Sequence, residues 1–205
     1  MQLYAITDRR QFVSTEALVE QALEWAKGGV DFVQIREKDL PATELTALAR
    51  GIVRAVRSTG GSARVLLNGP AEIAAASCCD GVHLTADMPG SAIAEARAVM
   101  SEAVAHPVIS VSCHTPSDIK SARDHGATLS VFAPVFEKQS GTETVPGQGL
   151  DSLAAACRIA GPMPVFALGG VTAANARDCV KAGAAGIAAI RLFASNDWRS
   201  LQLPG

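Results

Sequence analysis

The chain has 205 residues, of which 48% are hydrophobic, 19% charged and 4% aromatic, and its formal net charge is −2. This composition excludes global disorder, and it argues against nucleic-acid binding, which needs a basic surface and stacking side chains. No apolar run reaches the length of about 18 residues that a membrane-spanning helix needs, so we expect a cytoplasmic protein with no membrane contact.

Strand-like and helix-like stretches alternate from the first residues onward. The first half predicts strands at 2–6, 32–38, 64–68 and 81–84, with helices at 14–27, 41–58, 70–77 and 91–99. The second half predicts strands at 108–112, 128–132, 165–168 and 186–190, with helices at 116–125, 150–160 and 173–182. A loop rich in Gly, Thr and Ser fills 134–149, and the tail at 193–205 has room only for a stunted last helix.

Four joints between a helix and the next strand resemble one another and carry Gly29, Gly81, Gly126 and Gly183. Glycine is common where a helix ends in a left-handed turn. Eight repeated units without a linker predict one α/β domain over 1–205, a single (β/α)8 barrel with a short C-terminal end. A doubly wound open sheet is the alternative, because such barrels typically need about 250 residues.

The cysteines, tryptophans and His83 receive structural interpretations. The five cysteines form no CxxC pair and no metal-ligand spacing, so we interpret them as small hydrophobes in a reducing compartment. We interpret His83 as a packed or hydrogen-bonded residue, since a second set of metal ligands is missing. Trp25 and Trp198, on outer helical faces, fit either internal packing or the surface of a homo-oligomer.

The second strand carries the strongest functional signal. Side chains alternate along a strand, so Gln34, Arg36 and Lys38 point one way, and Val33 and Ile35 point the other way. Two cations on one face need water or an anionic ligand, because unpaired buried charges cost several kcal/mol. An edge strand with a solvated face is the structural alternative.

In a barrel of this kind, the residues that follow each strand meet at one rim, where active sites form. Besides the second strand, this rule selects Asn68, His114, Glu137 and Lys138. A histidine at such a rim moves protons near neutral pH, although a loop histidine taken alone is more often structural.

A phosphate site is predicted after the seventh and eighth strands. Gly169 and Gly170 stand between a strand and a helix, where exposed backbone N–H groups favour a phosphate. Glycine also serves tight turns, so the pair alone is weak evidence. The neighbouring turn at Ile190 and Arg191 strengthens it, because the loops after strands seven and eight form the usual phosphate site of such barrels.

Six motifs in order resemble the thiamin phosphate synthase/TenI superfamily. They are QIREK at 34–38, LNG at 67–69, DGVHL at 80–84, SCHT at 112–115, PVF at 134–136 and ALGGVT at 167–172. The resemblance covers nearly the whole chain and implies a compact (β/α)8 barrel. It also implies a small-molecule partner, a thiazole phosphate.

The sequence departs from the synthase branch at its metal ligands. The resemblance implies two aspartates that hold Mg²⁺ on a pyrophosphate, but one position is Gly69 and the other falls on Met88 unless Asp87 replaces it. These departures resemble the TenI branch, which includes metal-independent thiazole tautomerases. That branch implies His114 as the acid and base, Arg36 and Lys38 facing a carboxylate, and Gly169, Gly170 and Ile190 holding the phosphate; the role of Arg191 is our own inference.

Three functions follow from these features. The first is aromatisation of a carboxylated thiazole phosphate by proton transfer, with no metal and no cofactor. The alternative is thiamin phosphate synthase, which joins hydroxymethylpyrimidine pyrophosphate to thiazole phosphate and would require Mg²⁺. The third is a non-catalytic regulator that binds thiazole or thiamin phosphates.

Overall fold

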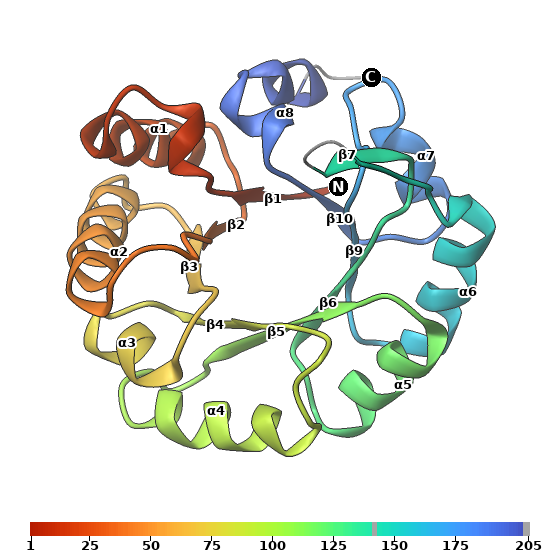
Figure 1. Cartoon of the computed structure of the whole chain (residues 1–205), viewed down its shortest axis with the longest axis horizontal. Coiled ribbons are helices and arrows are strands. Elements are labelled where there is room, and N and C mark those ends of the chain that lie inside the picture. The colour runs from red at the N-terminus through yellow and green to blue at the C-terminus, as the bar shows by residue number, and fades with distance from the viewer. Residues whose placement is uncertain (141–142, 203–205) are drawn as a thin grey trace.

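Eight parallel strands form a closed barrel, and helices surround it (Figure 1). The structure is a computed structural model that describes residues 1–140 and 143–202. In order around the barrel the strands are β1 (Gln2–Ile6), β2 (Phe32–Ile35), β3 (Arg64–Leu67), β4 (Gly81–Leu84), β5 (Val108–Cys113), β6 (Leu129–Phe132), β9 (Val165–Ala167) and β10 (Gly186–Ala189), which pairs with β1. The predicted (β/α)8 barrel is confirmed, and the closed order excludes the open doubly wound sheet.

The helices alternate with these strands along the chain. They are α1 (Thr15–Lys27), α2 (Ala42–Arg57), α3 (Ala71–Ala76), α4 (Ser91–Ser101), α5 (Pro116–Asp124), α6 (Gly149–Ala160), α7 (Ala176–Lys181) and α8 (Arg191–Ala194). Short 3₁₀ turns cover Arg9–Gln11 and Asp197–Gln202. No helix in the described part of the chain is long and apolar enough to cross a membrane.

Alternating side chains fill two layers, one inside the barrel and one between the strands and the helices. Inside the barrel the rings of Tyr4, Phe32 and Phe166 pack against one another with centroids 5.4, 5.5 and 5.6 Å apart. Each such pair contributes about 0.5–1.5 kcal/mol beyond its buried area. The interior is therefore a packed core, and a ligand reaches the barrel at its rims.

The predicted glycine joints are correct at three of four places. Gly29, Gly126 and Gly183 have φ of 82°, 83° and 104°, the left-handed region that glycine adopts without strain. At the fourth joint the left-handed residue is Cys78, with φ of 59°. Gly81 instead lies inside β4, where a Cβ would overlap the backbone of Val108.

Helix α7 begins three residues later than the predicted start at 173. The Asn175 side chain accepts a hydrogen bond from the Thr172 N–H at 2.8 Å and donates one to the Gly170 carbonyl at 3.0 Å. Asparagine side chains stabilise turns in this way at the expense of helix. The segment after β9 is therefore a side-chain-braced turn, and the helix starts only at Ala176.

Both tryptophans lie in the interior, so the oligomer-surface interpretation of Trp25 and Trp198 is wrong. Neither side chain is exposed. Trp25 Nε1 donates to the Phe193 carbonyl at 3.2 Å, and the ring of Trp198 stacks on Phe193 with centroids 5.9 Å apart. These contacts fasten the short C-terminal elements to α1.

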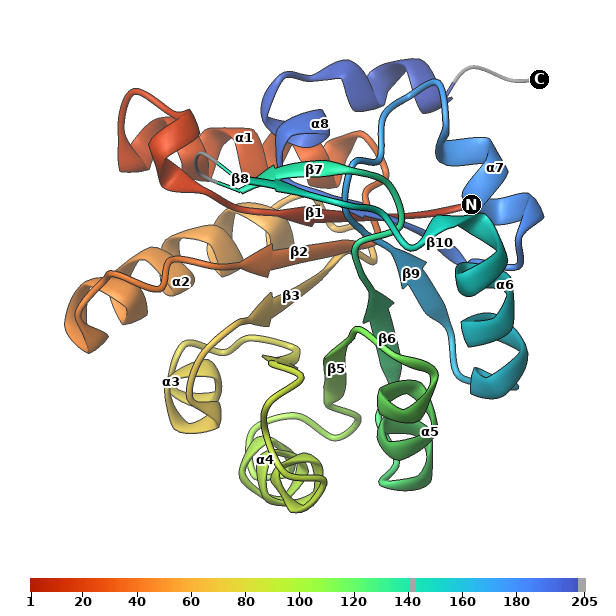
Figure 2. The same ribbon diagram turned by 45° about the vertical axis from the view of Figure 1, so that its right-hand side comes forward.

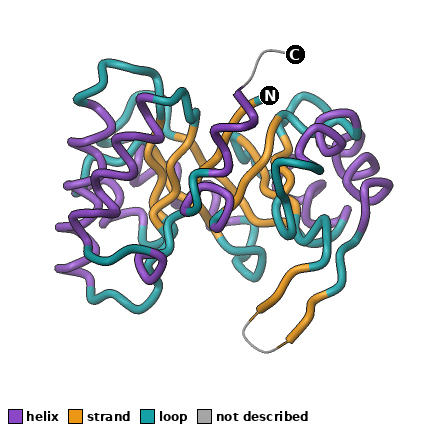
Figure 3. Tube along the Cα trace, turned by 90° about the horizontal axis from the view of Figure 1, so that it is seen from above, coloured by secondary structure: helices purple, strands orange, loops and turns teal. Residues whose placement is uncertain are grey.

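The expected loop at 134–149 contains a β-hairpin that the sequence analysis missed. Strands β7 (Lys138–Ser140) and β8 (Glu143–Val145) pair antiparallel (Figure 2), and they project from the barrel in Figure 3. Residues 141–142 lie outside the described residues. Apart from Val145 the two strands are polar, and they lack the apolar alternation that marks a half-buried strand, which explains the omission.

Candidate active site

The end of β2 places its two cations beside the mouth of the barrel. Gln34 is 1% exposed inside the barrel, Arg36 is half-buried and Lys38 is exposed. Both cations lie close enough to His83, on β4, to lower its pKa. Gln34 points into the barrel, where it bonds Tyr4, and Arg36 and Lys38 follow the end of the strand. The edge-strand alternative fails because β2 pairs with both β1 and β3.

A chain of hydrogen bonds crosses the barrel interior from β2 to β5. Tyr4 Oη donates to Gln34 Oε1 at 2.9 Å and lies 3.4 Å from Ser110 Oγ. His83 then joins Ser110 through Nδ1 and Ser112 through Nε2, each at 2.8 Å. Burial, followed by the charges of Arg36 and Lys38, lowers the pKa of His83 to about 3, so its imidazole is neutral at physiological pH.

His83 is therefore a satisfied, buried residue, as the sequence analysis expected. The partners in this chain, Tyr4, Ser110 and Ser112, were not among the predicted site residues. Ser112 lies in the motif around His114, but nothing in the sequence indicates that its hydroxyl meets His83, 29 residues away.

His114 follows β5 at the same rim and is exposed. Its Nδ1 lies 2.7 Å from the Ala133 carbonyl oxygen. Because a carbonyl only accepts, Nδ1 carries a hydrogen, and Nε2 forms no hydrogen bond within the described residues. The backbone N–H of His114 donates to Asp118 Oδ2 at 2.8 Å, which fixes the turn between β5 and α5. The geometry permits an acid and base at this place.

Asn68 follows β3, the strand that pairs with β2, and is half-buried. Its backbone N–H donates to the Ile35 carbonyl at 2.9 Å, which ties it to the end of β2. Glu137 and Lys138 follow β6, one exposed and the other half-buried at the base of the hairpin. The structure places all three on the rim.

Gly169 and Gly170 lie directly against the segment that follows β6. Their φ values are 94° and 64°, and a Cβ on either would overlap Pro134 or the Phe136–Glu137 backbone. Close packing therefore requires these glycines, whatever the ligand. The backbone N–H groups of Gly170 and Val171 make no hydrogen bond within the described residues, so they remain available to an acceptor.

Ile190 precedes the four-residue helix α8, and Arg191 is its first residue. Arg191 is exposed and forms no ion pair within the described residues. β10 lies next to β9 in the barrel, so this turn adjoins the Gly169–Gly170 turn. The structure therefore brings the predicted phosphate-site residues to one part of the rim.

A family model described as thiamine monophosphate synthase matches residues 3–193. The chain belongs to this family. A thiamine-phosphate synthase of Roseiflexus sp. (strain RS-1) is 32% identical over 92% of this chain and 76% of its own length. A protein of Geobacter sulfurreducens, whose name gives thiamine-phosphate synthase as a provisional function, is 42% identical over 92% of this chain and 84% of its own.

A solved structure, the thiamine phosphate pyrophosphorylase from Pyrococcus furiosus, has a TM-score of 0.79 at 27% identity. The structural match covers 98% of this chain and 93% of the Pyrococcus furiosus chain. The resemblance deduced from the six motifs is confirmed, and the chain is an enzyme of the thiamin-biosynthetic family.

The residues present do not fit the Mg²⁺ ion that the synthase resemblance implies. Gly69 offers no side-chain donor, and the described residues contain no group of three His, Cys, Asp or Glu side chains that could hold a metal. Asp87 is exposed and belongs to no such group within the described residues. Hydrogen bonds from Thr85 and from its own backbone, followed by the charge of Lys38, lower the pKa of Asp87. A single exposed carboxylate is a poor substitute for the several oxygen ligands that Mg²⁺ prefers.

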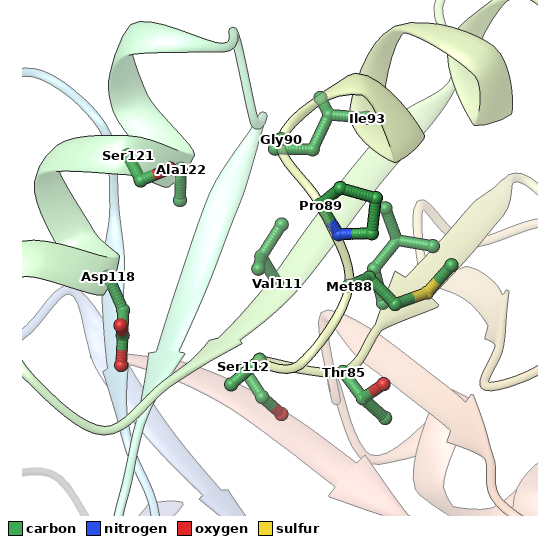
Figure 4. A pocket seen from close by; sticks show the side chains of 12 residues that line it. Thr85, Met88, Pro89, Gly90, Ile93, Val111, Ser112, Asp118, Ser121 and Ala122 are labelled. Carbon is green, nitrogen blue, oxygen red and sulfur yellow. The ribbon is translucent and has the colours of Figure 1, made fainter.

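A small cavity lies next to the site, between the segment after β4 and helix α5 (Figure 4). Thr85, Met88, Ser112 and Asp118 are among its lining residues, and its volume is about 60 Å³. Ligand pockets usually measure about 300–1,000 Å³, so this cavity holds a few waters at most. It is too small for a substrate that carries a ring and phosphates.

Proposed function

We propose that this chain catalyses the thiamine-phosphate synthase reaction, joining hydroxymethylpyrimidine pyrophosphate to thiazole phosphate. The single observation that carries this proposal is the family match over residues 3–193, which includes the cationic end of β2. Relatives that bear this name cover most of the chain. The sequence alone favoured the tautomerase, and the comparisons support the alternative better.

This reaction depends on cations that bind the leaving pyrophosphate, and it needs no residue that transfers a proton. The bond between the pyrimidine methylene carbon and the pyrophosphate oxygen breaks, and its electron pair leaves with pyrophosphate. The lone pair of the thiazole nitrogen then forms the new carbon–nitrogen bond, so no proton moves at the reacting atoms. Arg36 and Lys38 would stabilise the charge that grows on the leaving group, as preorganised cations do.

The remaining rim residues supply the two other binding functions. The free N–H groups of Gly170 and Val171, beside Arg191, would hold the phosphate of the thiazole. Gln34, fixed by Tyr4, and the neutral His83 would face the pyrimidine ring at the floor of the mouth. Asn68, Glu137 and Lys138 would line its sides.

Thiazole tautomerisation is the second candidate, and two observations favour it. The metal-ligand set is absent from the described residues, and His114 presents an unbonded Nε2 at the rim. In that reaction His114 would take a proton from the ring carbon and return it at another position. Arg36 and Lys38 would then hold the carboxylate.

One assay separates the candidates. The purified protein is incubated with both synthase substrates, with Mg²⁺ or with EDTA, and separately with the carboxylated thiazole phosphate. Release of pyrophosphate together with thiamin phosphate supports the synthase. Aromatisation of the thiazole without coupling would replace it with the tautomerase, and tight binding without any product would indicate the non-catalytic regulator.

A further inference from the structure

Glu37 is a buried carboxylate between the two cations in sequence, and it has no part in the proposed reaction. Its side chain is 2% exposed and faces away from the barrel. Glu37 Oε1 accepts from the Thr7 hydroxyl at 2.6 Å and from the Arg9 N–H at 3.0 Å, and Arg9 Nη1 lies 3.6 Å from Oε2. A buried charge is strongly destabilising unless it is paired in this way.

Thr7 connects this carboxylate to the backbone of Arg36. The hydroxyl gives its one hydrogen to Glu37, and its oxygen accepts the Arg36 N–H at 3.0 Å. The Thr7 N–H also donates to the Gln34 carbonyl at 2.9 Å. The paired residues of β1 and β2 end at Ile6 and Gln34, so Thr7 and Glu37 continue the pairing with side-chain bonds where the regular ladder stops.

The same arrangement keeps Glu37 away from the cations beside it. Arg9 donates to Asp39 through Nη1 and Nη2, at 2.6 and 2.9 Å, and also pairs with Glu37. Within the described residues neither Arg36 nor Lys38 forms an ion pair. Arg9 thus pairs with both Glu37 and Asp39, and Arg36 and Lys38 stay available for an anionic ligand.

We propose that Glu37, acting through Thr7, is a positioning residue that aims Arg36 and Lys38 at the anion and leaves them unpaired. This inference rests on the anion-binding role of Arg36 and Lys38 in the proposed function. It assigns a reason for the buried charge of Glu37.

The test measures binding of inorganic pyrophosphate by calorimetry at fixed ionic strength. Thr7→Val keeps the shape and removes the hydroxyl, Thr7→Ser keeps the hydroxyl, and Glu37→Gln removes the charge. Hydrogen bonds to charged groups contribute enough that we expect roughly tenfold weaker binding for Thr7→Val and Glu37→Gln. Thr7→Ser should stay within about twofold of wild type, and kcat at saturation should change less than KM.

Thr128→Val is the matched control. Thr128 Oγ1 accepts the Ile109 N–H at 3.0 Å, which is the same kind of bond at the opposite rim of the barrel. The Thr128→Val substitution should lower the melting temperature and leave pyrophosphate binding unchanged. Equal loss of binding in Thr128→Val and Thr7→Val, or wild-type binding in Glu37→Gln and folded Thr7→Val, would overturn the inference.

Failure of the proposed function and failure of the positioning role give different results. If the wild-type protein binds no pyrophosphate, the proposed function fails and the positioning role fails with it. If the wild type binds and the variants bind equally well, only the positioning role fails. Should Thr7→Val not fold, Glu37→Gln and Thr7→Ser decide the matter alone.

Discussion

At the scale of single residues, His83 makes stability depend on pH. Its folded pKa of about 3 lies below the value of about 6.5 in an unfolded chain, so the unfolded state binds one more proton between these values. Stability is full above pH 6.5 and falls as the pH falls toward 3. At pH 5 we expect His83 to account for a loss of about 2 kcal/mol.

His83→Asn tests this expectation in urea unfolding at pH 7 and pH 5. The variant should be less stable than wild type at pH 7 but should lose about 2 kcal/mol less between the two pH values. The exposed His106, replaced in His106→Asn, should keep the wild-type pH dependence. An equal pH dependence in His83→Asn would mean that the buried imidazole is protonated in the folded protein.

Replacement of His114 should affect the rates of the two candidate reactions differently. The coupling reaction moves no proton, so His114→Ala should lower the coupling kcat less than about tenfold. General acid–base catalysis contributes about 10²–10⁴-fold, so the same variant should lower any aromatisation rate by that factor. His125→Ala, another exposed histidine, is the control for both assays. A coupling rate reduced as strongly as the aromatisation rate would contradict the proton-free scheme.

At the scale of elements, the junction between α1 and the C-terminal 3₁₀ turn depends on one glycine. A Cβ on Gly28 would overlap the buried ring of Trp198. We expect Gly28→Ala to destabilise the protein by about 1–3 kcal/mol through overpacking. Gly51→Ala in α2 is the contrast, because its Cβ would lie 3.5 Å from Val19 Cγ2, an ordinary contact.

Gly51→Ala should stabilise the protein by about 0.5–1 kcal/mol, since alanine favours helix over glycine. Urea unfolding of both variants measures the difference. If Gly28→Ala were neutral, the Trp198 ring would have to move freely, contrary to its complete burial.

Elements marked by an apolar run could be predicted, and element ends set by single side-chain hydrogen bonds could not. The strand at 108–112 agrees with β5 to within one residue because its apolar run is its own signal. The start of α7 was placed three residues early because the Asn175 side chain decides it. The second strand ends at Ile35 in the regular ladder, and Thr7 holds the residues beyond it.

At the scale of the whole molecule, the barrel explains which parts of the site were predictable. Parallel strands end at one rim, so Arg36, His114 and Gly169 could be assigned to one mouth from chain order alone. The hydrogen bonds of the barrel interior join distant parts of the chain: Tyr4 and Ser110 are 106 residues apart in sequence. Such contacts leave no local pattern, so the interior chain and the role of Thr7 emerge only from the fold.

Anion binding at this rim should stabilise the entire barrel. A closed barrel of this size is expected to unfold cooperatively, so a ligand bound to the folded state alone raises the melting temperature. Inorganic pyrophosphate at 100 times its Kd adds about 2.7 kcal/mol, which corresponds to a rise of roughly 5–10 °C for a chain of this length.

The rise should be the same in EDTA, because the described residues contain no group of three metal-binding side chains. It should disappear in Arg36→Gln, whereas Arg54→Gln, on the exterior helix α2, should keep it. Differential scanning fluorimetry with and without EDTA measures both effects. A shift that requires added Mg²⁺ would show that Asp87 and the pyrophosphate together build a metal site, and that Arg36 and Lys38 do not suffice for the anion.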